Sequence, residues 1–89
     1  MKVRDLEGWP PRPAGSYQST DSAPAGERAI LKEVVRSHHN WVTFVCSLDG
    51  KLHTCDLEAP DRTDALQLEK ILRNNPGKSL SEIGEIEIR

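Results

Sequence analysis

Two strand-like runs that meet at Asp49 and Gly50 constrain the fold of this chain more than any other feature. The runs cover residues 41–48 and 51–57 and are rich in β-branched and aromatic side chains, which favour strands. Asp-Gly supplies the two positive-φ positions of a type I′ turn, whose twist matches that of the flanking strands. The sequence therefore predicts a β-hairpin with a two-residue turn.

The turn also predicts which hairpin residues lie opposite each other, because a two-residue turn sets the register. The pairs on one face are Leu48 with Lys51, Cys46 with His53, Phe44 with Cys55 and Val42 with Leu57. Successive side chains of a strand point to opposite faces, so the second face should carry the alternate residues. These are Trp41, Thr43, Val45, Leu52, Thr54 and Asp56.

The length and composition allow one small domain. The chain has 89 residues, of which 36% are hydrophobic, and this supports a modest core but no second independent domain. Residues 1–26 hold four of the six prolines and a polar run from Ser16 to Gly26, a composition typical of tails and linkers. We therefore expect a Pro/Ser-rich N-terminal arm at residues 1–26, partly disordered, and a small α+β domain at residues 27–89.

The arm contains three large apolar residues before Tyr17, namely Val3, Leu6 and Trp9. They leave three possibilities open: the arm is a solvated tail, it packs on its own domain, or it binds an external partner.

Residues 28–36 are expected to form a strand, with a short helix as the alternative. Both interpretations bury the same residues, which are Ile30, Leu31, Val34 and Val35.

A helix is predicted after the hairpin. Asp61 or Thr63 can accept hydrogen bonds from the first turn, and an apolar stripe follows at three- and four-residue spacing. The stripe consists of Ala65, Leu68, Ile71 and Leu72, and the run from Asn74 to Gly77 ends the helix. Residues 81–89 alternate Ile86 and Ile88 with acidic neighbours, which predicts a half-buried strand with a bend or bulge at Gly84.

These elements predict the α+β class: an antiparallel β-meander with one helix packed on the sheet, a C-terminal strand (β-β-β-α-β) and a flexible Pro-rich N-terminal arm. A right-handed crossover would place the last strand parallel to the first, in the spatial order 3-2-1-4. Alternatively the last strand pairs with a second copy of the protein. The sequence therefore leaves monomer and homodimer open.

Charge and composition argue against several functional classes. The 12 basic and 14 acidic residues give a net charge of −2, so nucleic-acid binding is at most weak. No apolar run approaches the ~20 residues that span a bilayer. Met1 is followed by charged residues, and two cysteines are too few for a disulfide scaffold. We expect no membrane association and a cytoplasmic protein with reduced thiols.

The one chemical cluster that the register creates is Cys46, His53 and Cys55. Two sulfurs and an imidazole suit zinc, but the spacing is unlike that of zinc knuckles and a fourth ligand would have to come from His38 or His39. We favour the interpretation that the cysteines are small, unbridged core residues and that the loop at residues 37–40, which contains His38 and His39, is a solvated turn. The sequence contains no catalytic or cofactor signature, so we expect neither enzymatic activity nor a cofactor.

A sheet covered by one helix leaves its second face only partly protected. We therefore expect the residues that bind a partner to be Trp9, Trp41, Val45 and Leu52. The best functional hypothesis is a small non-enzymatic protein-interaction module with an unknown protein partner. The alternatives are a metal-binding protein that uses Cys46, His53 and Cys55, and a weak nucleic-acid-binding protein.

Overall fold

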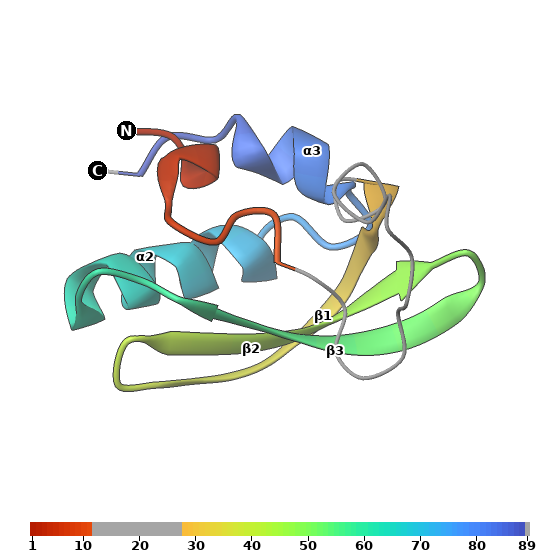
Figure 1. Ribbon diagram of the computed structural model, residues 1–89, viewed down its shortest axis with the longest axis horizontal. Coiled ribbons are helices and arrows are strands. Elements are labelled where there is room, and N and C mark those ends of the chain that lie inside the picture. The colour runs from red at the N-terminus through yellow and green to blue at the C-terminus, as the bar shows by residue number, and fades with distance from the viewer. Residues whose placement is uncertain (12–27, 89) are drawn as a thin grey trace.

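The fold is built on a three-stranded antiparallel sheet with helices on one side, as a computed structural model that describes residues 1–11 and 28–88 shows. The strands are β1 (Ile30–His38), β2 (Trp41–Leu48) and β3 (Lys51–Glu58), in the order β1-β2-β3. The helices η1 (Val3–Asp5), α2 (Arg62–Arg73) and α3 (Leu80–Gly84) lie on the same side of the sheet (Figure 1). The predicted α+β class is confirmed.

The predicted hairpin and its register are confirmed. Asp49 and Gly50 have positive φ values of 53° and 79°. Cys46 lies opposite His53 and Phe44 opposite Cys55, and the other two predicted pairs are also present. We call the face that carries these side chains the inner face, because its central residues are fully buried, and we call the opposite face the outer face.

Residues 30–38 form strand β1, so the helix alternative for this region is wrong. Its register slips twice against β2, between Leu31 and Glu33 and between Val34 and Arg36. Each slip inserts an extra residue, which interrupts the alternation of the two faces. As a result only Leu31 is fully buried among the four residues expected in the core, and Val35 is 49% exposed.

The helix predicted after the hairpin is α2, and it packs on β1 and β2. The Asp61 side chain caps it by accepting a hydrogen bond of 2.8 Å from the backbone N–H of Asp64. The predicted apolar stripe is buried, and Leu66 lies outside it with 46% exposure. Within the described residues, no helix is long and apolar enough to cross a membrane.

The C-terminal strand was predicted wrongly, and the described sheet has no fourth strand. Residues 80–84 form helix α3 instead. The Ser79 side chain accepts a hydrogen bond from the backbone of Glu82, and the Glu82 side chain reaches back to the backbone of Ser79. This reciprocal capping box favours a helix start at a point where the alternation of Ile86 and Ile88 suggested a strand.

The residues after α3 pair with the N-terminus of the chain, whose end lies beside the C-terminal end in Figure 1. The backbone N–H of Val3 donates to Ile86 O at 2.9 Å, and that of Ile88 donates to Met1 O at 2.7 Å. Val3 and Leu6 are buried in the core. Residues 1–11, which we call the N-terminal segment, therefore pack on the domain. Residues 12–26 of the predicted arm, and the boundary at residue 26, lie outside the described residues.

The indole of Trp9 packs against α3 at Gly84. A Cβ atom added at Gly84 would lie 3.0 Å from Trp9 Nε1 and 3.2 Å from Arg4 Cβ. Only a residue without a side chain fits there without displacing these neighbours. Gly84 was expected to mark a bend or bulge, but its role is to allow this close approach.

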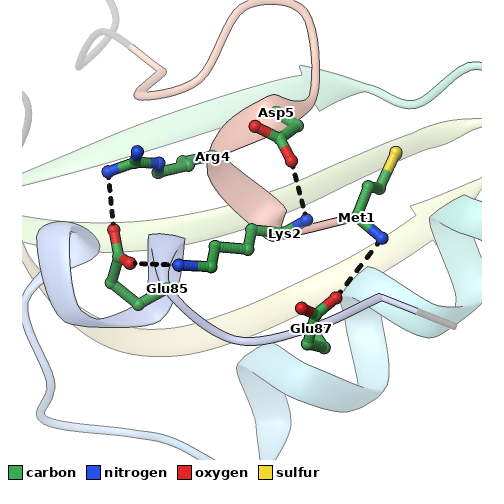
Figure 2. Close-up of polar contacts among 6 residues, drawn as sticks. All are labelled: Met1, Lys2, Arg4, Asp5, Glu85 and Glu87. Carbon is green, nitrogen blue, oxygen red and sulfur yellow. Dashed lines mark hydrogen bonds and ion pairs between the residues drawn. The ribbon is translucent and has the colours of Figure 1, made fainter.

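Charged side chains also join the two ends of the chain (Figure 2). Lys2 Nζ and Arg4 Nη1 each lie 2.9 Å from a carboxylate oxygen of Glu85, and the amino group of Met1 lies 3.3 Å from Glu87 Oε2. The hydrogen bond from Lys2, together with the positive charges of Arg4 and Lys2, lowers the pKa of Glu85 below its ordinary value. The carboxylate form of Glu85 therefore stabilises the pairing of the two ends.

The contribution of the N-terminal segment to the core can be measured with Leu6→Ala. We expect this substitution to lower the free energy of unfolding by about 2–4 kcal/mol, the usual cost of truncating a buried leucine. Urea denaturation followed by circular dichroism measures it. The matched control is Glu7→Ala at the exposed neighbouring position, which should change the free energy by less than about 0.5 kcal/mol. Equal midpoints for Leu6→Ala and the native chain would show that the segment does not belong to the core.

The pairing of the chain ends should also weaken in acid. Because folding lowers the pKa of Glu85 below 4.5, its contribution to stability is present above that pH and is lost as the pH falls through the lowered value. Glu85→Gln should therefore destabilise the protein at neutral pH, and its difference from the native chain should shrink below pH 4.5. Urea titrations across this range measure the effect, with Glu33→Gln as the control. A difference that stays constant with pH would contradict the assignment.

Candidate functional site

Three of the four residues predicted to bind a partner lie on the outer face. Trp41 is 43% exposed and Leu52 is 67% exposed, while Val45 between them is half-buried. Trp9, the fourth, packs against the hydrophobic core instead. Of the four residues predicted to bind a partner, three are therefore on the outer face, and Trp9 contributes to the packing of the fold.

The exposed residues do not form one continuous apolar patch. Trp41 and Leu52 are separated by two cross-strand pairs, and each step of two residues along a strand covers about 6.6 Å. One of these pairs is polar, since Thr43 Oγ1 donates a hydrogen bond of 2.6 Å to Asp56 Oδ1. Trp41 and Leu52 are thus roughly 20 Å apart, at opposite ends of the hairpin.

A groove of about 530 Å³ lies beside Trp41. Glu7 and Pro11 line it from the N-terminal segment, while Trp41, Asp56 and Glu58 line it from the end of the sheet. The groove therefore exists because the N-terminal segment comes close to the strand ends. The exposed Trp41 therefore lines a concave site.

Contacts of Asn40 fix the sheet side of the groove. Its side-chain Nδ2 donates to Ala59 O at 2.9 Å and to Glu58 Oε2 at 3.2 Å, and the backbone N–H of Ala59 donates to Asn40 O at 2.7 Å. These bonds tie the turn before β2 to the residues that follow β3. They hold the Trp41 and Glu58 ends of the two strands side by side.

The groove carries negative charge. Glu7, Asp56 and Glu58 line it, and the described part of its lining contains neither lysine nor arginine. Asp56 and Glu58 accept hydrogen bonds from the neutral side chains of Thr43 and Asn40. Among the described residues, none of the three carboxylates forms an ion pair.

The alternative metal site is a pair of buried thiols. Cys46 and Cys55 are fully buried, and their sulfurs lie 3.5 Å apart as unbridged thiols. The hydrogen bond with Cys55, and then burial, raise the pKa of the Cys46 thiol far above its usual range. His53 is half-buried and forms no hydrogen bond to either sulfur in the described part of the chain.

The described residues contain no group of three or more His, Cys, Asp or Glu side chains arranged to hold a metal ion. His38 and His39, considered as a fourth ligand, are exposed, and their rings contact each other with centroids 4.4 Å apart. Both thiols lie in the core, where the favoured interpretation of the sequence placed them.

Comparisons with known proteins give no relative for this chain: no protein-family model, curated protein or solved structure matches it. The candidate site consequently rests on its own geometry. Sequence reasoning placed Trp41 and Asp56 on the correct face, but it missed the groove, Glu7 and Glu58. No local signal predicts that the N-terminal segment lies near residues 56–60, since the two regions are far apart in the sequence.

The exposure of Trp41 can be tested with single-tryptophan variants. Trp9→Phe leaves Trp41 as the fluorophore, and Trp41→Phe leaves Trp9. We expect acrylamide to quench the fluorescence of Trp41 more strongly, because its indole is accessible whereas that of Trp9 packs between the core and α3. Stern–Volmer constants measure the difference. If the two constants were equal, Trp41 would be covered and the candidate site closed.

Proposed function

We propose that this protein is a small non-enzymatic interaction module that binds another protein through Trp41 and the groove beside it. The observation that carries the proposal is the position of Trp41, 43% exposed at the rim of a groove of about 530 Å³. Concave sites with a few polar groups are common ligand sites. A groove with an aromatic wall suits a side chain or a short segment of a partner.

Tryptophan has specific advantages at such a site. It is enriched among the residues that contribute most to binding energy, because its large rigid surface loses little conformational entropy on contact. Leu52 and Val45 extend the same face along the hairpin, and a partner that follows the strands would reach them after the groove. We therefore assign Trp41 as the anchor and the other two as accessory contacts.

The chemistry of the described residues supports binding without catalysis. Nucleophilic catalysis requires an activated group beside a base. Cys46 and Cys55 contact each other in the core, where substrate does not reach them. We further propose a cytoplasmic location, because reducing compartments keep thiols such as Cys46 and Cys55 unbridged.

Site-specific photocrosslinking tests the proposed function. The photoreactive amino acid benzoylphenylalanine replaces Trp41 in the full chain, which is expressed in the cells that carry its gene and irradiated there. We expect discrete crosslinked products that contain a second protein. Once that protein is purified, Trp41→Ala should weaken its binding by about tenfold or more, the effect expected of an anchor residue.

Leu66 provides the matched control, because it is 46% exposed and lies on α2, away from the outer face. The same photoreactive residue at position 66 should give none of the products obtained from position 41. Products that are identical at both positions, or absent from position 41, would refute the proposed interaction surface.

A further inference from the structure

The groove beside Trp41 combines an indole with an excess of negative charge, and this combination restricts what it can bind. Three carboxylates line the groove, and within residues 1–11 and 28–88 no lysine or arginine does. A positive charge close to a carboxylate is attracted to it in water, and more strongly near a protein surface, where the effective dielectric constant is lower. A cationic group is therefore favoured over a neutral or anionic one.

Within the part of the chain that the structure describes, the partners of Asp56 and Glu58 leave the charge of these carboxylates uncompensated. Asp56 and Glu58 accept hydrogen bonds from a hydroxyl and an amide, which are neutral donors. The ion pairs of the described residues use other acidic groups, namely Glu69, Glu85 and Glu87. A ligand cation would thus add an interaction that the described residues of the groove do not supply.

The indole of Trp41 favours one kind of cation. A guanidinium group is planar, so it can stack on an aromatic ring while its edge donates two parallel hydrogen bonds to a carboxylate. A lysine ammonium is a compact point charge and cannot do both. The remaining lining includes the exposed Pro60, which offers apolar surface for the methylene stem of a long side chain.

We propose that the groove binds an arginine side chain of an extended segment in the partner protein, with the guanidinium against Trp41 and its charge facing Glu7, Asp56 and Glu58. This inference rests on the proposed function, because it names the chemistry of the partner at the same site. It adds a requirement for positive charge and for a planar group that protein binding alone does not impose.

Amide NMR titration of the full chain tests the inference with three capped heptapeptides. Arginine alternates with alanine in the first, citrulline replaces arginine in the second, and lysine replaces it in the third. Citrulline keeps the shape of arginine without its charge. We expect the arginine peptide to bind with a dissociation constant of about 1 mM or tighter, and the citrulline peptide at least about tenfold more weakly. The shifts should centre on Trp41, Asp56 and Glu58.

Variants of the groove should weaken the arginine peptide specifically. Asp56→Asn combined with Glu58→Gln keeps both side-chain shapes and should reduce affinity about tenfold, since it removes two of the charges that attract the guanidinium. Trp41→Ala should reduce it by a similar factor. Glu33→Gln on β1 removes an exposed carboxylate outside the groove lining and should leave the affinity unchanged. A dispersed amide spectrum shows that each variant is folded.

Several outcomes would overturn the arginine assignment. These are equal binding of the citrulline or lysine peptide, shifts centred away from the groove, and no shift up to about 1 mM peptide. Binding that occurs only after Arg12→Ala would also overturn it, because an arginine of the chain itself would then be the occupant.

If photocrosslinking at position 41 still captured a protein in any of these cases, the interaction module would stand and only its arginine specificity would fail. Peptide binding without crosslinked products would refute the protein partner instead.

Discussion

The inner face of the sheet needs more cover than one helix provides, and the rest of the structure depends on how that cover is completed. Helix α2 lies over β1 and β2. On the β3 side, the N-terminal segment takes its place and comes so close that a Cβ atom at Gly8 would lie 3.3 Å from Leu57 Cδ1. The pairing of residues 1–3 with residues 86–88 holds this segment on the sheet. The two chain ends therefore act together as the second cover of the core.

Local physics explains which parts of this fold could be predicted from the sequence. The turn at Asp49 and Gly50 sets the hairpin register through backbone geometry, and the Asp61 cap with its apolar stripe defines α2. The bulges of β1 have no comparable local signal, and they expose Val35 although its side chain is apolar. The last residues were misread because Ile86 and Ile88 alternate as in a strand. The alternation reflects their pairing with the N-terminus, a contact that only the folded chain reveals.

The candidate site likewise has parts that could be predicted from local sequence and parts that could not. The exposure of Trp41 and Leu52 follows from the register, so the sequence alone placed both on the correct face. The packing of Trp9 does not follow from the register, because it depends on Gly84 in α3, which is distant in the sequence. The groove was missed for the same reason, since one wall comes from the N-terminal segment and the other from residues 40–60 in the middle of the chain. The site forms because residues that are distant in the sequence come together in the fold, and no local sequence pattern marks them.

One consequence concerns the relation between stability and binding. The N-terminal segment buries Val3 and Leu6 in the core and supplies Glu7 and Pro11 to the groove. The wall at Trp41 is fixed by the strand ladder and by Asn40, whereas the other wall is present only while the segment is docked.

A ligand that contacts both walls must therefore stabilise the docked segment by mass action, and undocking of the segment must lower the apparent affinity. The ion pairs of Glu85 lie among the chain ends, outside the groove lining, yet they act on this same equilibrium. The affinity for a ligand that contacts both walls and the stability of the paired chain ends therefore both depend on how firmly the N-terminal segment is docked.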